Sequence, residues 1–479
     1  MGGKMDSKVA LRFLWFFFLI PGLAYPEEAT LKSTSDEQVG VEVTVYNNDL
    51  GLVKDTRKIA LPKGRGELRF MDVAASIMPW TVSVKSMTNP ESFSVLEQNY
   101  EYDLINRAKL LDKYVDKQVK LMHWNYYQDR KEVVDATLLS NNQGEIYLID
   151  KEIYLGHPGI PILPKLPENL IAKPTLTWLF ENNTDKPHQL EVSYLTKNIS
   201  WKTDYVITVN ANDTAADVLG WVTLDNKSGT TYKDARLKLI AGEIHQAETN
   251  KREKMLSASE EMPRPKALPS FEEKSFFEYH MYSLQRKTTI KDKQTKQVNL
   301  LEAFGIGVKK ELLVYGVKTY WIRQFRETVP KQPVNVYLVF KNSKENKLGM
   351  PLPAGLMRVY KQDTDGNNQF IGEDKISHTP KDEEVKLLLG NAFDVVAERS
   401  QTDFKQVTSR LYETEWQINV RNHKDEEVTV GIIEPLLGNW NVIQTSHPFK
   451  KMDAFTIRYD VKVPKDDEVK VKYRVRVGI

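Results

Sequence analysis

The sequence predicts a mainly β protein: two or three antiparallel β-sandwich modules of the immunoglobulin-like kind, with a small insert that combines a short helix with a barrel or sheet. Three observations support this class. After about residue 40, apolar and polar residues alternate with a period of two, which is typical of half-buried strands. Strands follow one another without helices between them, which argues against a parallel α/β fold. Polar turns between alternating runs indicate recurrent hairpins, and they begin at Asn182, Asn226, Asn342 and Asn422.

Residues 38–102 are predicted to form an N-terminal β domain, because short alternating runs are separated there by turns rich in Gly, Pro and Asn. Residues 103–117 are the best helix candidate, since Leu104, Ala108 and Leu111 fall on one helical face. The tightly spaced short strands that follow, up to residue 157, predict a small barrel or sheet.

Residues 158–173 are predicted to form a proline-rich strut. Prolines recur there every third residue, which favours a polyproline II rod. Such a rod can pack on its own domain as a rigid element, or it can serve as the ligand of a proline-binding groove.

Residues 174–246 return to strand patterning and predict a central β-sandwich. Residues 247–275 are charged, contain three prolines and lack aliphatic periodicity, which predicts a flexible insertion. Residues 276–479 predict a C-terminal β-sandwich region. It ends in alternating runs at 455–463 and 469–477, which we interpret as a hairpin.

Residues 1–24 have the pattern of a secretory signal peptide: basic residues, the apolar run 13–20, and small residues that end at Ala24. The apolar run is far shorter than the roughly 20 residues that span a bilayer. No cysteine follows Ala24, so a lipid anchor at that point is excluded. We expect export to the periplasm or the cell surface, with no membrane span after removal of the signal.

Composition excludes several functional classes. The 479 residues include 67 basic and 65 acidic residues, a formal net charge of +2, and no cysteine. A balance this close to neutral gives no global attraction to nucleic acid. The absence of cysteine excludes disulfides, thiol nucleophiles and cysteine-ligated metals. No nucleic-acid partner and no cofactor is predicted.

No catalytic or metal-binding motif is present in the sequence. There is no G-x-S-x-G, no P-loop and no H-E-x-x-H, and the eight histidines are scattered. The segment 363–367 begins like a calcium loop, but its glycine comes too early. We interpret it as an Asp-Gly turn between two strands. No catalytic, cofactor-binding or metal-ligating residue is therefore assigned.

Two groups of residues are candidate contact sites. His123, Trp124, Tyr126 and Tyr127 cluster at the end of a predicted strand, where exposed aromatic rings would suit stacking on a sugar or a peptide. The last strand carries a basic stripe that could bind an anionic surface or polysaccharide. The same stripe is also typical of a solvated sheet face. It consists of Lys470, Lys472, Arg474 and Arg476.

Several long stretches resemble a bacterial family catalogued as domain of unknown function 4139. They are spread over nearly all of the chain after residue 40: 43–64, 166–183, 194–210, 220–245 and 352–399. The resemblance implies an exported, β-rich protein and carries over no activity, substrate or catalytic residue. Some relatives are labelled mucoidy inhibitors, which points to the cell envelope or exopolysaccharide. Those relatives usually have coiled-coil insertions, which this sequence lacks.

Three functional hypotheses follow. The first is a non-enzymatic cell-envelope or cell-surface protein that binds a protein or glycan partner. The second is a polysaccharide- or envelope-acting hydrolase, which needs two carboxylates roughly 5–10 Å apart. Acidic residues are frequent enough to supply such a pair in one part of the sequence, at Asp363, Glu373, Asp374, Glu398 and Asp403. The third is a structural subunit of a surface layer or fibre whose sheet edges pair between chains.

Overall fold

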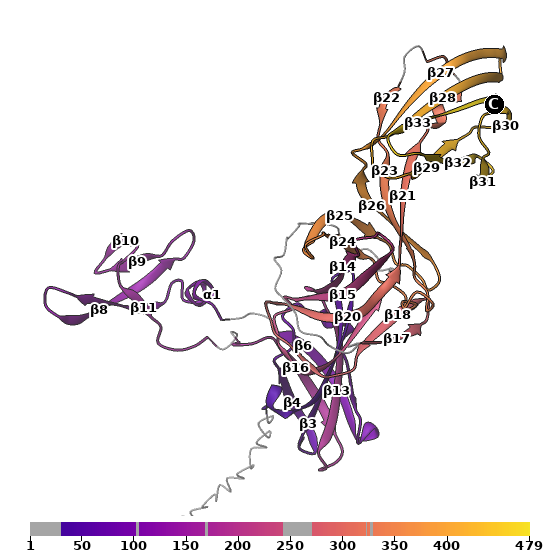
Figure 1. The fold of residues 1–479 in the computed structure, drawn as a ribbon. Coiled ribbons are helices and arrows are strands. Elements are labelled where there is room, and N and C mark those ends of the chain that lie inside the picture. Colours follow the sequence, from indigo (N-terminus) through magenta and orange to yellow (C-terminus); the bar gives the residue numbers. More distant parts are fainter. Residues whose placement is uncertain (1–29, 102–104, 168–170, 243–270, 322, 326–328) are drawn as a thin grey trace, which may run out of the picture.

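A computed structural model of the chain describes residues 30–101, 105–167, 171–242, 271–321, 323–325 and 329–479. The predicted signal peptide, residues 1–24, and all but the end of the predicted insertion 247–275 lie outside these ranges. The described chain is mainly β, and its strands form six sheets, as the sequence predicts for the fold class. Five sheets build an elongated body, and the sixth projects from it as a separate arm (Figure 1).

The first two sheets of the body bring together the beginning and the middle of the chain. Sheet 1 has the order β1-β4-β12-β6, with β1 (Thr30–Ser33), β4 (Gly64–Met71), β12 (Thr175–Asn182) and β6 (Phe93–Glu101). Sheet 2 has the order β17-β18-β16-β2-β3-β13-β5, with β19 (Thr288–Ile290) beside β16. Its strands are β17 (Phe271–Phe276), β18 (Tyr279–Leu284), β16 (Tyr232–Ala241), β2 (Gln38–Tyr46), β3 (Leu50–Ile59), β13 (His188–Thr196) and β5 (Ser83–Ser86).

The other three body sheets continue toward the C-terminus. Sheet 3 consists of β20 (Gln294–Gly307), β15 (Ala215–Asn226), β14 (Ile199–Val209), β24 (Gly355–Gln362) and β25 (Asn368–Ile376). Sheet 4 consists of β26 (Glu384–Asn391), β23 (Asn335–Lys341), β21 (Lys309–Tyr315), β29 (Val428–Pro435), β32 (Thr456–Val463) and β31 (Lys450–Asp453). Sheet 5 consists of β22 (Val329–Gln332), β27 (Val395–Thr408), β28 (Leu411–Asn422), β33 (Asp467–Gly478) and β30 (Asn439–Thr445). Short 3₁₀ turns lie at Ser35–Glu37, Pro79–Thr81, Pro90–Ser92 and Lys318–Trp321.

Neighbouring sheets of the body pack on shared cores. The first core joins sheets 1, 2 and 3 through residues such as Trp178, Val43 and Trp201. A second core lies between sheets 3 and 4, and a third between sheets 4 and 5. The segments expected as an N-terminal and a central unit therefore contribute to one core. Alternation along a strand shows which face is buried, but it does not show which strands share the interior.

Most pairs are antiparallel, as expected, but parallel pairs join successive parts of the body. They are β2 with β16, β14 with β24, and β21 with β29. A further parallel pair attaches β1 to β4 at the edge of sheet 1. Through these junctions sheets 2, 3 and 4 each extend from one sandwich into the next. The sequence did not indicate them, because the two strands of a parallel pair are far apart along the chain.

The four asparagine turns are not hairpins, so that part of the prediction is wrong. Each turn carries the chain from one sheet to the sheet that faces it: β12 to β13, β15 to β16, β23 to β24 and β28 to β29. The asparagine itself is fully buried in all four turns. Its amide nitrogen donates to backbone carbonyls and its oxygen accepts from a backbone N–H, so that a polar side chain is satisfied inside the sandwich.

The predicted C-terminal hairpin is also wrong. β32 pairs with β29 and β31 in sheet 4, whereas β33 pairs with β28 and β30 in sheet 5. Both strands bury their apolar faces in the same core, from opposite sides. Their alternation was therefore interpreted correctly, but it fits a crossing between facing sheets as well as it fits a hairpin. The Asp-Gly turn at 363–367 does close a hairpin, between β24 and β25.

The arm contains a helix shorter than predicted and an open sheet. Helix α1 spans Arg107–Asp112 within the predicted 103–117, and Asn106 caps it by accepting from the Lys109 backbone N–H at 2.9 Å. The arm sheet has the order β10-β9-β8-β7-β11. Its strands are β10 (Glu152–Leu155), β9 (Ile146–Ile149), β8 (Arg130–Ser140), β7 (Gln118–Asn125) and β11 (Ile160–Ile162). Of the two alternatives in the prediction, the sheet is the one observed.

The predicted strut and insertion are partly strand. Within 158–173, residues 160–162 form β11, whose central Pro161 lies opposite Leu121 of β7. Lys165 then packs back on the arm, where its carbonyl oxygen accepts from the Tyr114 hydroxyl at 2.6 Å. Within 247–275, strand β17 begins at Phe271 and pairs with β18. β11 and β17 are strands because each pairs with a neighbouring strand. Local composition, which is rich in proline or charge in these segments, does not reveal that pairing.

Candidate binding surface on the arm

One face of the arm sheet is packed and the other is open. The packed face forms a small core with α1 and the turn after it, and includes Leu111, Tyr114, Leu121 and Leu138. Strand periodicity sends the alternate side chains to the opposite face. The register aligns Ile160 with Met122 and Met122 with Val133 in one row, and Leu148 with Ile153 in another.

We define the open face of the arm by the apolar side chains that share this orientation. They are Met122, Trp124, Val133, Ile146, Leu148, Ile153, Leu155, Ile160 and Ile162. Ile153 is 65% exposed, Leu155 85% and Ile160 60%. A solvated face of an antiparallel sheet normally carries polar side chains. A face with this many exposed apolar groups is typical of an interaction surface.

The predicted aromatic cluster lies at one end of this face, in the turn between β7 and β8. Trp124 is 47% exposed, Tyr126 86% and Tyr127 is fully exposed. The Asn125 side-chain oxygen accepts from the backbone N–H groups of Tyr127 and Gln128 at 3.0 and 3.2 Å, which fixes the shape of the turn. Three of the four predicted residues are therefore brought together as an exposed group, which we call the hairpin tip.

His123, the fourth predicted residue, lies on the packed side of β7. It neighbours Trp124 in sequence, so the two side chains point to opposite faces of the strand. Its Nε2 lies 3.5 Å from a carboxylate oxygen of Glu132, and its ring meets the edge of the His157 ring. A hydrogen bond from the Asn125 amide is the main cause that lowers the pKa of Glu132, so this carboxylate is charged beside His123 at neutral pH.

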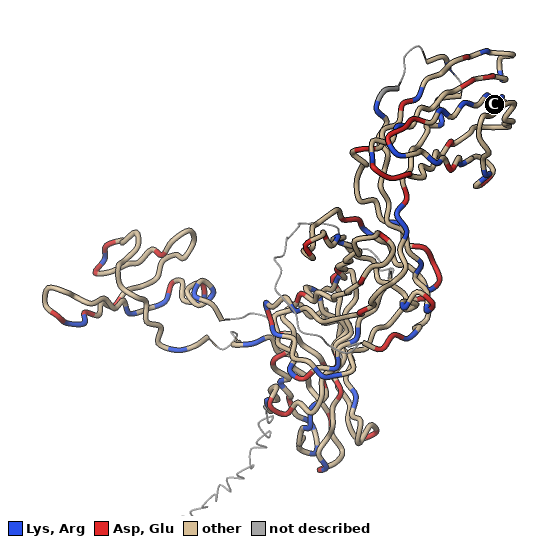
Figure 2. Tube along the Cα trace, in the orientation of Figure 1, with Lys and Arg blue, Asp and Glu red and all other residues tan. Residues whose placement is uncertain are grey.

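The basic stripe of β33 is paired with acids, most of which lie on neighbouring strands. Lys472 and Arg474 bond to Glu415 of β28, at 2.9 and 3.3 Å, and Arg474 also reaches Asp403 at 2.8 Å. Arg476 bonds to Glu413, and Lys470 lies 3.3 Å from Glu468. Both signs of charge are likewise interspersed along the rest of the trace (Figure 2). The stripe is thus locally neutralised and does not form an isolated cationic surface.

Each carboxylate considered for a hydrolase has another partner in the fold. Asp363 accepts backbone N–H groups within its own turn, and Asp374 accepts the Leu388 N–H. The other three are bonded to arginines: Glu373 to Arg358, Glu398 to Arg421 and Asp403 to Arg474. These contacts, made on strands of sheets 3 and 5, hold the acids as ion-pair or turn-forming partners. Within the described residues, no group of three His, Asp or Glu side chains could hold a metal ion.

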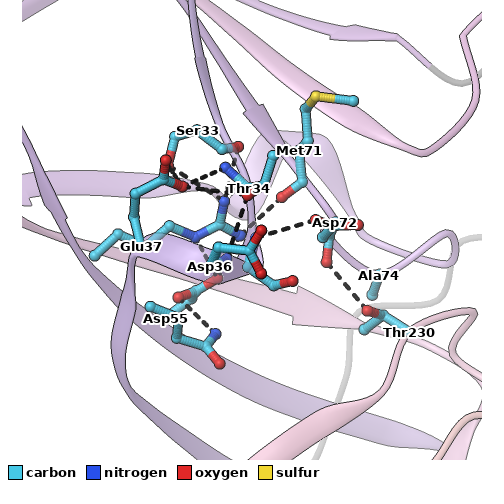
Figure 3. A network of polar contacts seen from close by, with 12 residues as sticks. Ser33, Thr34, Asp36, Glu37, Asp55, Met71, Asp72, Ala74 and Thr230 are labelled. Atoms are coloured by element: carbon cyan, nitrogen blue, oxygen red, sulfur yellow. Dashed lines mark hydrogen bonds and ion pairs between the residues drawn. The ribbon is translucent and has the colours of Figure 1, made fainter.

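Sequence reasoning missed a cavity of about 330 Å³ between β2, β3, the turn after β1 and the loop after Asn226. At its base Arg57 is fully buried and stacks on Phe70, with its guanidinium carbon 3.5 Å from the ring centroid. The Arg57 Nη2 donates to Asp55 at 2.8 Å and to the Met71 carbonyl at 2.7 Å, while Nη1 donates to the Ser33 carbonyl (Figure 3). Neither residue was singled out, because Asp55 and Arg57 have the spacing of an ordinary strand.

The rim of the cavity is polar and also internally paired. Asp72 accepts the Ser35 backbone N–H at 3.0 Å and forms an ion pair with Lys173. Burial raises the pKa of Asp72, but the hydrogen bonds from Lys173 and Ser35 outweigh it, so the pKa lies below its ordinary value. The charged groups therefore neutralise one another. The bond from Arg57 to the Ser33 carbonyl attaches β1 to the body. The arrangement is that of a structural network.

The fold and surfaces define a class: a β protein of serially packed sheets that carries an arm with an open apolar face. Residues 190–477 match the family model described as "Domain of unknown function (DUF4139)". Because the match covers more than half of the chain, the protein belongs to this family, as the resemblance indicated. No curated protein matches this chain. Among the residues that the structure describes, no helix is long and apolar enough to cross a membrane.

Proposed function

We propose that the protein is exported and acts without catalysis at the cell envelope or cell surface, by binding a protein or glycan partner through its arm. The observation that carries this proposal is the open face of the arm together with the hairpin tip. Exposed apolar groups on one sheet face cost solubility, and binding a partner would remove them from water.

The position of the arm supports the same function. The arm lies between β6 and β12 along the chain, and its sheet stands clear of the body (Figure 1). Side chains on a projecting element can reach a partner without rearrangement of the body. At the hairpin tip, Trp124, Tyr126 and Tyr127 offer flat rings that suit stacking on sugar rings or on extended peptides.

The test is capture of a partner from the native cell envelope by the tagged protein. We expect the wild type to recover a protein or a glycan. The variant Trp124→Ala/Tyr126→Ala/Tyr127→Ala should lose it. Trp80→Ala is the matched control, because Trp80 is an equally exposed aromatic residue, at 77%, but lies on the body. The proposal fails if no partner is recovered, or if the tip variant captures as much as Trp80→Ala.

A further inference from the structure

The two edges of the arm sheet differ in their protection against strand pairing. At one edge, β11 is three residues long and contains Pro161, which has no N–H to offer. At the other edge, all four residues of β10 are exposed, and within the described chain β10 pairs with β9 alone. β10 contains no proline, no lysine and no bulge, and Glu152 is its one charged residue. It therefore lacks the usual devices that prevent edge pairing.

The turn before β10 determines which of its peptide groups face outward. Asp150 and Lys151 both have positive φ, 46° and 72°, as in a two-residue type I′ hairpin turn. In such a hairpin the flanking residues, Ile149 and Glu152, form a hydrogen-bonded pair, and hydrogen-bonded pairs alternate along the ladder. Glu152 and Tyr154 therefore bond toward β9. The peptide groups of Ile153 and Leu155 point away from the sheet.

We propose that this edge pairs with the same edge of a second copy of the chain, antiparallel, with Tyr154 on the two-fold axis. In this register Ile153 of each copy lies opposite Leu155 of the other, so their outward peptide groups form hydrogen-bonded pairs. The four aliphatic side chains come together on one face of a continuous ten-stranded sheet. The two open faces then merge into a single surface.

Charge and symmetry favour a second copy as the occupant. Glu152 of one copy lies opposite Gly156 of the other, so no like charges meet across the junction. The strand is complementary to itself over Ile153–Leu155, which pair with the same three residues of the other copy, and Glu152 lies opposite the residue that follows β10. The protected edge at β11 cannot continue the pairing, so the assembly closes at two copies instead of growing into a fibre.

The absence of cysteine allows a direct test of the register. Tyr154→Cys introduces the single thiol of the chain. On the axis of a non-hydrogen-bonded pair, the two Cα atoms lie about 4.5 Å apart. This lies within the roughly 4.4–6.8 Å that a disulfide spans. Under mild oxidation we expect most of this variant to become a covalent dimer on a non-reducing gel.

Two matched thiols serve as controls. Tyr127→Cys places the thiol on the hairpin tip, where it is fully exposed but far from the axis. Ile153→Cys places it on β10, opposite Leu155 of the second copy instead of opposite itself. Both variants should run mainly as monomers on the same non-reducing gel. Cross-linking of either control as complete as that of Tyr154→Cys would overturn the proposed register.

Sedimentation of the cysteine-free protein tests the dimer itself. We expect a concentration-dependent monomer–dimer equilibrium in the wild type and at least a tenfold weaker one in Ile153→Lys/Leu155→Lys. Val133→Lys is the control, since Val133 is an exposed residue of the same face on the interior strand β8. The proposal fails if the wild type stays monomeric, or if Val133→Lys weakens the dimer as much as the edge variant does.

This dimer goes beyond the proposed binding function and can fail independently of it. Pairing at β10 leaves the hairpin tip free, because the tip lies on the β7–β8 turn. If the protein is monomeric and still captures its partner, only the proposed dimer is ruled out. If the protein is a dimer and captures nothing, only the proposed binding function is ruled out.

Discussion

Asn422 of sheet 5 is joined directly to Pro464, the residue that follows β32 of the facing sheet 4: the Asn422 Nδ2 donates to the Pro464 carbonyl oxygen at 2.9 Å. The same amide also donates to the carbonyl oxygens of Val463 and Glu426. Asn422 is the last residue of β28 and Pro464 follows β32, so one side chain closes the end of the C-terminal sandwich. Asn182, Asn226 and Asn342 occupy corresponding places in the other sheet crossings.

Replacing Asn422 by alanine should therefore destabilise the C-terminal sandwich. The change leaves buried carbonyl groups without a donor, which costs about 1–3 kcal/mol. Urea unfolding followed by tryptophan fluorescence measures the loss in the free energy of unfolding, because Trp321 and Trp416 lie in the same core. Asn441→Ala, an exposed asparagine of β30, is the control and should change the free energy of unfolding by less than about 0.5 kcal/mol. Equal losses in the two variants would contradict the role of Asn422.

The buried ion pair between Arg57 and Asp55 predicts a non-additive effect. Arg57→Met leaves the Asp55 carboxylate buried without its cation, and breaking such a pair costs about 3–5 kcal/mol. The double variant Asp55→Leu/Arg57→Met removes both charges and should be more stable than Arg57→Met alone. Thermal unfolding of the two variants makes the comparison. A double variant less stable than the single one would show that the charges do not depend on each other.

Asp213 predicts a loss of stability in acid. It lies in the β14–β15 turn and forms ion pairs with Lys310 of β21 and Lys361 of β24. Burial raises the pKa of Asp213, but the bonds from the two lysines outweigh it, and the pKa falls below 3.8. A carboxyl group with a lower pKa in the folded state stabilises the fold above its unfolded pKa. It loses that contribution as the pH falls through the folded pKa.

Unfolding midpoints measured from pH 7 down to pH 2 test this sign. Asp213→Asn should be less stable than the wild type at pH 7, and the difference should shrink toward pH 2 as the wild-type carboxyl group takes up its proton. Asp365→Asn, an exposed residue of the β24–β25 turn, should follow the wild type throughout. A difference for Asp213→Asn that is constant over this range would rule out ionisation as its cause.

The paired basic stripe predicts a gain of anion binding when its acids are removed. Glu413→Gln/Glu415→Gln frees Arg476 and Lys472 from their partners and leaves Arg474 paired with Asp403 alone, while the strand retains its shape. The variant should elute from a heparin column at higher salt than the wild type. The control is Glu384→Gln, which removes one negative charge from an exposed position on β26, away from the stripe. It should shift elution less per removed charge than the double variant does. Equal shifts per removed charge would mean that the stripe has no local effect.

Residue patterns predicted part of the candidate site. The sequence indicates Trp124, Tyr126 and Tyr127 because these large aromatic residues cluster at the end of a predicted strand. His123 was grouped with them although its side chain points to the opposite face, which the period of a strand implies once the strand is identified. The apolar open face could not be predicted. Val133 and Ile160 have the same alternation as core residues, and they differ from them only in lacking a covering layer.

The sequence by itself determined the β class, the approximate strand positions and the absence of cysteine chemistry, because these depend on local alternation, turn residues and composition. Only the tertiary structure decided which strands are neighbours. β32 and β33 have the pattern of a hairpin and yet belong to facing sheets. Asp55 and Arg57 appear as surface residues and are buried under β1. The reason is physical: alternation specifies a buried face, whereas pairing and burial depend on segments far apart along the chain.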